Sequence, residues 1–278
     1  MDRHGIAVRR RLGRARRRMR PSDGTAGHDV AHRPVLAGLA AAVRPSHHRA
    51  APRWHPVQDR AGRAGADRGT LFMTAIPLLA VDGLAMRFGA QQLFNGLDFT
   101  AGPGAVALVG PNGTGKSTLL TLLAGIATPQ AGTIRIAGHV LAQAPHQAKR
   151  NLAYVPDESV AYDFMTGAQF LGMVDALRGT RDAPQAAPLI AGLGLTAHVD
   201  KRFAAMSLGT RKKFMLAAGL MGGAPVVLMD EPSNGIDADA KAWLARLIRQ
   251  QAATRLLLFS THDSELIEAT GAGLLRLG

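Results

Sequence analysis

The sequence predicts an α/β fold in which a mixed sheet is flanked by helices, together with a small antiparallel β portion. The first observation behind this prediction is composition. Of the 278 residues, 47% are hydrophobic and 19% are charged, which is enough to build a packed core. The second is a set of short, continuous apolar segments, which are typical of strands buried on both faces of a sheet. These segments are residues 105–109, 152–155, 226–229 and 256–259.

Further strands are predicted at the two ends of this pattern. Residues 76–81 and 92–99 have strand-like composition, and the Phe88–Gly89 pair between them is typical of a turn. We therefore expect these two strands to pair in an antiparallel manner. A last strand is expected at residues 273–277.

The positive charge of the chain is concentrated near its N-terminus. The whole chain has 33 Lys and Arg against 20 Asp and Glu, a net charge of +13, but residues 1–72 contain 16 Arg and only 5 Asp. Eight of these Arg lie between positions 9 and 20. Since residues 73–278 hold 17 basic and 15 acidic side chains, that part is nearly neutral and gives no reason to expect a specific nucleic-acid partner.

Residues 1–72 show neither helical nor strand periodicity, so we expect an Arg-rich extension that is disordered or not part of the native protein. Met73 is then the natural first residue of the folded domain 73–278, because the core-like pattern starts at Ile76. Two alternatives stay open: an arm that binds nucleic acid or acidic lipid, and a targeting peptide. In each case the Arg cluster is expected to bind anions nonspecifically.

Two absences from the sequence limit the possible function classes. The chain has no Cys, which excludes disulfides, thiolate zinc sites and cysteine nucleophiles. Its longest weakly polar run, residues 217–229, is interrupted by Gly and Pro and is shorter than the ~20 residues that a membrane-spanning helix needs. If the protein acts at a membrane, another chain has to cross it.

A glycine-rich loop follows the apolar segment 105–109 and matches the pattern G-x-x-x-x-G-K-[ST]. A helix with a broad apolar face is predicted directly after it, at residues 118–124. A chance match is expected in roughly 1% of chains of this length, and the flanking strand and helix make it rarer. The loop consists of Gly110, Pro111, Asn112, Gly113, Thr114, Gly115, Lys116 and Ser117.

Each residue type in this loop suits the binding of phosphate groups. The glycines let successive N–H groups, up to that of Thr118, converge on phosphate oxygens at a helix N-terminus. The ammonium of Lys116 would bridge the β- and γ-phosphates, and the Ser117 hydroxyl would bind Mg²⁺. The sequence therefore predicts a nucleoside triphosphate site in a P-loop NTPase core.

Polar residues that follow two other apolar segments indicate hydrolysis. Asp230 and Glu231 come directly after residues 226–229, where one carboxylate can lie near a metal ion and the other near the attacking water. His262 follows residues 256–259, at the carboxyl end of another predicted strand. Taken alone, an Asp–Glu pair also occurs in solvated loops, and a His also caps helices. Their order along the chain after the phosphate loop favours a catalytic role.

Taken in order, these motifs resemble the ATP-binding subunits of ABC transporters over about residues 76–276. In that family the glycine-rich loop is the Walker A motif, Asp230 is the Walker B carboxylate and Glu231 is the catalytic base that polarises water. Lys116 and His262, the latter in the place of the switch histidine, complete the expected catalytic set. The resemblance also implies nucleotide contacts from Phe88, by stacking on adenine, and from Ser207, Gly209 and Asp237 in the signature and D-loop positions. For Phe88, an ordinary core position in a strand is the alternative.

The resemblance further implies cofactors, partners and a location. The cofactors would be ATP and Mg²⁺, with Ser117, Asp230 and Asp157 around the metal. Two such domains, as a homodimer or with a paralogue, would close around two ATP molecules and drive a membrane-spanning transporter subunit. The chain would lie in the cytoplasm, peripheral on the inner face of the cell membrane. The compact length and the variant motifs favour a bacterial exporter over an importer.

A helical subdomain at about residues 158–205 is implied by the same resemblance. Within it, Thr166 to Gln169 has the form of a capping box, and a second helix is expected to end near Gly194. The resemblance also implies that the surface between Tyr154 and Met173 would dock on a membrane partner, as the corresponding surface does in members of the family.

Three positions depart from the family pattern. Leu208 replaces the first signature Gly, Thr210 replaces the signature Gln, and Asp157 replaces the Gln after residues 152–155. A carboxylate can hold a metal-bound water but, unlike an amide, donates no hydrogen bond at neutral pH. Two other functions therefore stay open: a soluble ABC-type ATPase of an assembly pathway such as iron–sulfur cluster biogenesis, and a degenerate nucleotide sensor.

Overall fold

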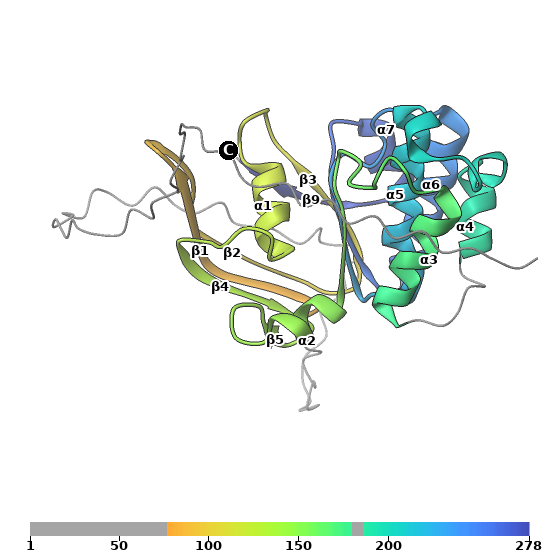
Figure 1. Ribbon diagram of the computed structural model, residues 1–278. Helices are drawn as coiled ribbons and strands as arrows, with labels where there is room; N and C mark the ends of the chain where they lie inside the picture. Colours follow the sequence, from red (N-terminus) through yellow and green to blue (C-terminus); the bar gives the residue numbers. More distant parts are fainter. Residues whose placement is uncertain (1–76, 180–185, 278) are drawn as a thin grey trace, which may run out of the picture. The chain divides into compact units, whose positions relative to one another are not determined.

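Two sheets form the framework of the described residues, 77–179 and 186–277, in a computed structural model (Figure 1). One sheet has five strands and the other has four. The predicted extension 1–72, its limit at Met73 and the predicted strand start at Ile76 all lie outside the described residues.

The first sheet contains five parallel strands, which are β3 (Gly104–Val109), β6 (Leu152–Val155), β7 (Val226–Met229), β8 (Leu256–Ser260) and β9 (Gly273–Arg276). Its order is β6-β7-β8-β3-β9, so the strand that precedes the glycine-rich loop lies between β8 and β9. All five strands are predicted from the sequence, and none of their limits is wrong by more than one residue. Because every pair is parallel, the carboxyl ends of these strands lie at one edge of the sheet.

The second sheet contains four antiparallel strands, which are β1 (Leu79–Phe88), β2 (Gln91–Ala101), β4 (Ala131–Ile136) and β5 (His139–Val140). The predicted turn after Phe88 is confirmed, but the predicted end of the first strand at residue 81 is wrong. β1 continues through a bulge at Asp82 and Gly83, where the register shifts and Gly83 has a positive φ. These two residues interrupt the alternation of apolar and polar residues, so the sequence pattern does not predict that the strand continues.

Helices cover the parallel sheet and form the helical subdomain. They are α1 (Lys116–Leu123), α2 (Pro145–Arg150), α3 (Gly167–Arg178), α4 (Ala186–Gly192), α5 (Leu208–Leu220), α6 (Ala238–Gln251) and α7 (Ser264–Thr270), with 3₁₀ turns η2 (Thr196–His198), η3 (Phe203–Ala205) and η4 (Met221–Gly223). Among the described helices, none is both long and apolar enough to span a membrane.

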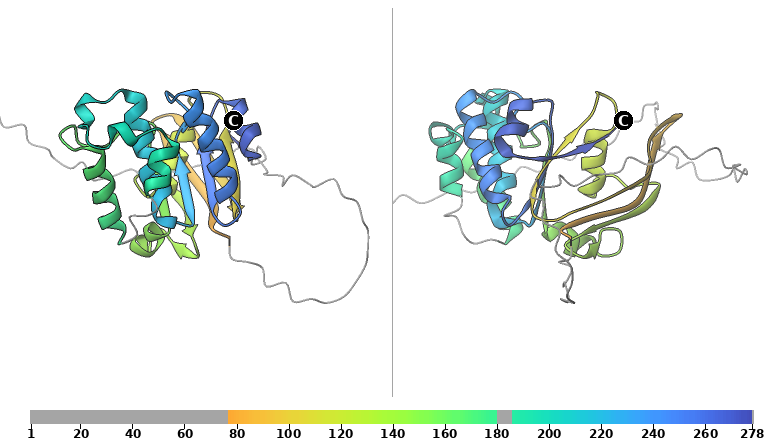
Figure 2. Two further views of the ribbon diagram at one scale, coloured as in Figure 1. Left: turned by 90° about the vertical axis from the view of Figure 1, so that its right-hand side faces the viewer. Right: turned by 180° about the vertical axis from the view of Figure 1, so that it is seen from behind.

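Alternate residues of the parallel sheet face two different hydrophobic cores. Leu108 and Leu258 pack with α1 and the antiparallel strands, whereas Ala107 and Leu257 pack with α5 and α6. Figures 1 and 2 show the same layering, with α1 between the two sheets and α5, α6 and α7 on the other face of the parallel sheet. Because successive strand residues point to opposite faces, only a continuous apolar segment fills both cores.

The helical subdomain is stabilised locally and by an aromatic cluster. The predicted capping box is present: the Gln169 N–H donates to Thr166 Oγ1, and the Thr166 N–H donates to Gln169 Oε1. The ring of Phe203 lies 5.3 Å from that of Phe170 and 5.6 Å from that of Phe214, between centroids. These contacts connect α3 to α5, the helix that follows the predicted signature.

Candidate nucleotide-binding site

The glycine-rich loop turns directly from β3 into α1, and two of its glycines are required by close contacts. A Cβ at Gly110 would lie 2.4 Å from the carbonyl oxygen of Leu277. A Cβ at Gly115 would lie 2.9 Å from the Phe94 ring, and Gly115 has a φ of +97° where it caps α1. The loop therefore has a backbone that only these residues permit, at a helix N-terminus suited to anions.

Lys116 lies over this loop and is only 8% exposed. Its ammonium donates to the carbonyl oxygens of Gly110, at 2.8 Å, and Pro111, at 3.2 Å. Both acceptors are neutral, so the positive charge is not balanced within the loop. It remains available to an anionic phosphate.

The two carboxylates after β7 are fixed by Ser260, at the end of β8. The Ser260 hydroxyl donates to Asp230 Oδ1 and accepts from the Glu231 N–H at 2.9 Å. Glu231 has a φ of +44°, a left-handed conformation that costs energy in a residue with a Cβ. Ser260 had no assigned role in the sequence-based site, although its place after an apolar strand indicates the same sheet edge.

Glu231 lies beside His262, with 3.4 Å between Glu231 Oε1 and His262 Nε2. Partial burial raises the pKa of the Glu231 carboxyl, His262 lowers it, and the nearby Asp230 raises it. A raised pKa makes a carboxylate a stronger base, which suits proton transfer from water.

Lys116, Glu231 and His262 line one pocket of about 440 Å³ together with part of the glycine-rich loop. Phe88 lies at the end of β1 with 55% of its surface exposed, so it is available for stacking rather than buried in a core. Of the predicted site residues, the pocket brings together Phe88, Asn112, Gly113, Gly115, Lys116, Ser117, Thr118, Glu231 and His262. Gly110, Pro111 and Thr114 shape the loop instead, through the contacts of Gly110 and a 2.9 Å hydrogen bond from Thr114 Oγ1 to the Pro111 oxygen.

The donor set fits a hydrated Mg²⁺ ion. Ser117 lines the pocket, whereas Asp230 is 5% exposed, is not among the lining residues, and is held by Ser260 next to Glu231, which does line it. Mg²⁺ usually keeps several water ligands and takes only one or two from protein, with phosphate oxygens completing its shell. A hydroxyl and a carboxylate therefore suffice, and a larger cluster of protein ligands is not needed.

The predicted signature and D-loop residues do not line this pocket. Ser207 caps α5 by accepting from the Thr210 N–H, and the neighbouring Leu208 is 82% exposed. A Cβ at Gly209 would lie 2.3 Å from the Gly235 oxygen, which explains the glycine there. Asp237 caps α6 and pairs with Lys213.

Asp157 also lies outside the pocket, and its carboxylate is paired with Lys212. Lys212, which sequence reasoning missed, is 5% exposed. Its ammonium donates to the oxygens of Pro156, Asp157 and Asp230 at 2.9–3.0 Å and to Asp157 Oδ1 at 3.1 Å. Burial lowers the pKa of Lys212, while the hydrogen bond to Asp157 raises it. Lys212 thus connects α5 to the ends of β6 and β7. The predicted metal contact of Asp157 stays a prediction.

We expect Lys212→Met to lower the free energy of unfolding by about 1–3 kcal/mol, because three carbonyl groups and one carboxylate lose their donor. The matched control is Lys241→Met, which removes a partly exposed ion pair with Asp263 and should cost less than about 1 kcal/mol. Urea unfolding measures both. Equal losses in the two variants would contradict the bridging role of Lys212.

The fold and this pocket define a P-loop nucleotide-binding domain. A family model described as ABC transporter matches residues 94–234, about half of the chain. The chain belongs to this family, and its described part is the ATP-binding ATPase domain.

Two curated relatives are bacterial ATP-binding proteins. Nod factor export ATP-binding protein I of Ralstonia nicotianae is 31% identical over 197 residues, which are 69% of this chain and 61% of that protein. The linearmycin resistance ATP-binding protein LnrL of Bacillus subtilis is 26% identical over 196 residues, 69% of this chain and 63% of that protein. The chain therefore spans about three fifths of these relatives. It spans less of others, such as 8% of a rat ATP-binding cassette sub-family A member 7.

Solved structures confirm the fold. A structure titled as an ATP binding subunit of an ABC transporter is 29% identical, with a TM-score of 0.67, and covers 72% of this chain and 85% of its own. A putative ABC transporter ATP-binding protein from Pyrococcus furiosus has a TM-score of 0.61 at 21% identity, which shows similarity of fold alone. This match covers 72% of this chain and 96% of the Pyrococcus furiosus chain.

Proposed function

We propose that the chain hydrolyses ATP with Mg²⁺ as the ATP-binding subunit of an ABC transporter. The observation behind this proposal is that Lys116, Glu231 and His262 line one pocket with the phosphate loop. Lys116 would bind the β- and γ-phosphates, and Glu231 would accept a proton from the attacking water with His262 beside it. Ser117 and Asp230 would hold the metal, which supplies positive charge to the phosphates.

Pairing with a second nucleotide-binding domain is supported by the predicted signature residues, which do not line the pocket. Ser207 and Leu208 are exposed at the N-terminus of α5. In this family such a signature faces the nucleotide bound by the other domain, so two copies of this chain, or a copy and a paralogue, would enclose two ATP molecules.

Dimerisation is tested by light scattering on the Glu231→Gln variant, which should bind ATP without consuming it. We expect its mass to double with ATP and Mg²⁺ but not with ADP. Adding Leu208→Glu should prevent the doubling, because a charge would be buried in the interface. Ile126→Glu, a change at another exposed apolar residue, should not. A monomer under every condition would contradict the two-domain site.

A membrane-spanning partner is supported by an exposed apolar patch. Val160, Tyr162 and Phe164 are all largely exposed, and the rings of Tyr162 and Phe164 stack at 5.5 Å between centroids. Contiguous exposed apolar surface marks protein interaction sites, and the patch falls where members of the family dock on their partners. The names of the two bacterial relatives, which refer to Nod factor export and linearmycin resistance, support export. A position at the inner face of the membrane follows from the proposed membrane-spanning partner.

Co-purification from detergent-solubilised membranes tests this partner. The full chain should copurify with a multi-span membrane subunit, and Phe164→Glu should abolish copurification without changing ATP affinity. Recovery in the soluble fraction, with the candidate partner co-expressed, would favour the alternative of a soluble ABC-type ATPase in an assembly pathway. The nucleotide-sensor alternative is excluded if ATP turnover is measured and Glu231→Gln abolishes it.

A further inference from the structure

A second, polar cavity of about 670 Å³ lies away from the phosphate loop. It is formed by α2, the end of α3 and the turn before β7, at the amino ends of β6 and β7. The phosphate loop follows the carboxyl end of β3 in the same parallel sheet, so the two cavities lie at opposite edges. Among the described residues that line it, none is acidic and four are basic: His146, Lys149, Arg150 and Arg178.

A buried guanidinium group lies next to the wall of this cavity. Arg255 is 8% exposed, and its Nε donates at 2.7 Å to the oxygen of Ala224, a residue that lines the cavity. Its Nη1 donates to the Leu220 oxygen and to Gln251 Oε1. Its Nη2 is buried and has no hydrogen-bond partner among the described residues. All of these acceptors are neutral, so the charge of Arg255 is not balanced by them.

Arg178 places a second guanidinium group at the turn before β7, to which Arg255 also donates. Its Nη1 donates to the Met221 oxygen at 3.1 Å. Within the described part of the chain, neither Arg178 nor Arg255 belongs to an ion pair. Burial lowers the pKa of both groups, and repulsion from Arg178 helps to lower that of Arg255, to about 10. Partly buried cations of this kind are stabilised by a nearby anion.

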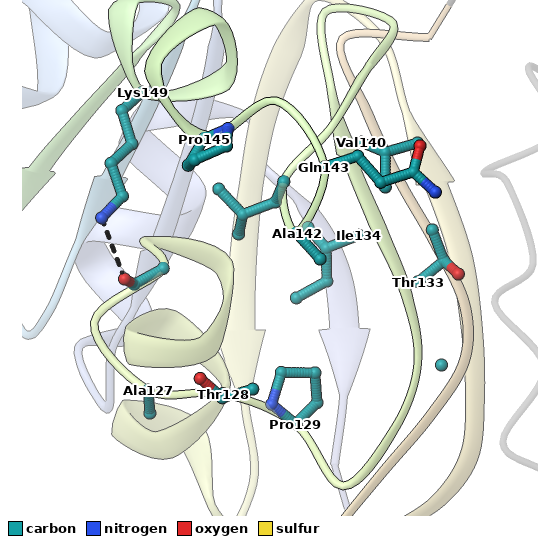
Figure 3. A pocket seen from close by; sticks show the side chains of 13 residues that line it. Ala127, Thr128, Pro129, Thr133, Ile134, Val140, Ala142, Gln143, Pro145 and Lys149 are labelled. Atoms are coloured by element: carbon teal, nitrogen blue, oxygen red, sulfur yellow. Dashed lines mark hydrogen bonds between the residues drawn. The ribbon is translucent and has the colours of Figure 1, made fainter.

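Lys149 adds a third cation from α2. Its ammonium donates to the carbonyl oxygen of Gly125, 3.0 Å away, beside a smaller cavity of about 230 Å³ that shares this lysine. Figure 3 draws this hydrogen bond from Lys149 as a dashed line. This acceptor is neutral too, so the contact positions the ammonium without cancelling its charge.

We propose that the 670 Å³ cavity, with its four basic residues, binds a small anion with two or more phosphate groups, either free in solution or as a lipid headgroup. Guanidinium groups bind phosphate oxygens through paired N–H donors, and a cavity of this volume lies in the range of small-molecule sites. The site is separate from the phosphate loop, so it does not depend on ATP hydrolysis or on the proposed transport function.

Calorimetric titration of the full chain with inorganic triphosphate tests the site, with ADP and Mg²⁺ saturating the phosphate loop. Besides the nonspecific binding expected of residues 1–72, we expect one saturable binding event that Arg178→Gln and Arg150→Gln each weaken about tenfold or more, since each removes a charge-assisted hydrogen bond. Arg249→Gln makes the same change of charge on an exposed residue of α6 and should leave the affinity unchanged. ATP hydrolysis should be equal in all three variants. Because Arg150 is exposed, its replacement also tests the site if Arg178→Gln fails to fold.

Vesicles distinguish the two sources of phosphate. The full chain is mixed with phosphatidylcholine vesicles that contain or lack cardiolipin, whose headgroup has two phosphates. Sedimentation with cardiolipin that is weaker in Arg178→Gln than in Arg249→Gln identifies a headgroup, whereas a difference in triphosphate binding alone identifies a free anion. The Arg-rich residues 1–72 are expected to bind both probes, so the comparison is always between charge-matched variants. If Arg178→Gln and Arg150→Gln match Arg249→Gln with both probes, the proposal is wrong.

Discussion

Glu231→Gln should lower the rate of ATP hydrolysis by about 100- to 10,000-fold while ATP affinity changes little. The substituted amide keeps the shape of the side chain and its place beside His262, but it cannot accept a proton from water at neutral pH. Phosphate release in single-turnover experiments, together with equilibrium binding of ATP, separates the two effects. Glu268→Gln is the control, because Glu268 is an exposed residue of α7 and does not line the pocket. Hydrolysis at the original rate in Glu231→Gln would exclude Glu231 as the base.

The same substitution should stabilise the fold at neutral pH. Burial raises the pKa of folded Glu231 above its ordinary value of 4.5, so the folded state binds this proton more tightly than the unfolded state. That contribution to stability is fully present below the unfolded pKa and is lost as pH rises through the folded pKa. At pH values above the folded pKa, burying the ionised carboxylate costs free energy, and a neutral Gln avoids this cost. The thermal midpoint of Glu231→Gln minus that of the original chain should therefore increase with pH from about 4.5 upwards and then level off. A lower midpoint in the variant at neutral pH would contradict this account.

The phosphate loop could be predicted from the sequence because its chemistry is local. Gly115, Lys116 and Ser117 are neighbours in the chain, and their roles depend on one turn between a strand and a helix. The parallel strands could be predicted equally well, since burial on both faces requires uninterrupted apolar segments. β1 was predicted too short because a bulge at Gly83 interrupts the alternation of apolar and polar residues without ending the strand.

Contacts between distant segments could not be predicted in this way. Lys212 is 55 residues from Asp157 along the chain, and in sequence it is one of several basic residues near the start of a helix. Only the docking of α5 against β6 and β7 converts it into a buried cation with four acceptors. Asp157, which the resemblance to ABC transporter subunits placed near the metal, is paired with this lysine through the same docking. Ser260 is similar, since its hydroxyl contacts Asp230 only because β7 and β8 are adjacent.

Lys116→Ala should weaken the binding of ATP and Mg²⁺ by about 10- to 100-fold, because a hydrogen bond to a charged group contributes about 1.5–3 kcal/mol. Hydrolysis should fall further, by about 100-fold or more, since charge on the transferred phosphate develops after binding. Equilibrium dialysis with ATP measures the first effect and phosphate release measures the second. Lys241→Ala removes an equal charge from a partly exposed ion pair outside the pocket and should change neither.

The stability of Lys116→Ala separates loss of binding from loss of fold. Among the described residues, the ammonium donates hydrogen bonds only to the carbonyl oxygens of Gly110 and Pro111, in a loop that lines the pocket, so water can replace it as their donor. The thermal midpoint without nucleotide should therefore stay near that of the original chain, while the increase in midpoint that ATP produces should be lost. If ATP binds a folded Lys116→Ala variant as tightly as the original chain, its phosphates do not lie against this loop. The assignment of Glu231 and His262 would then fail as well, because both are defined by their position around the same pocket.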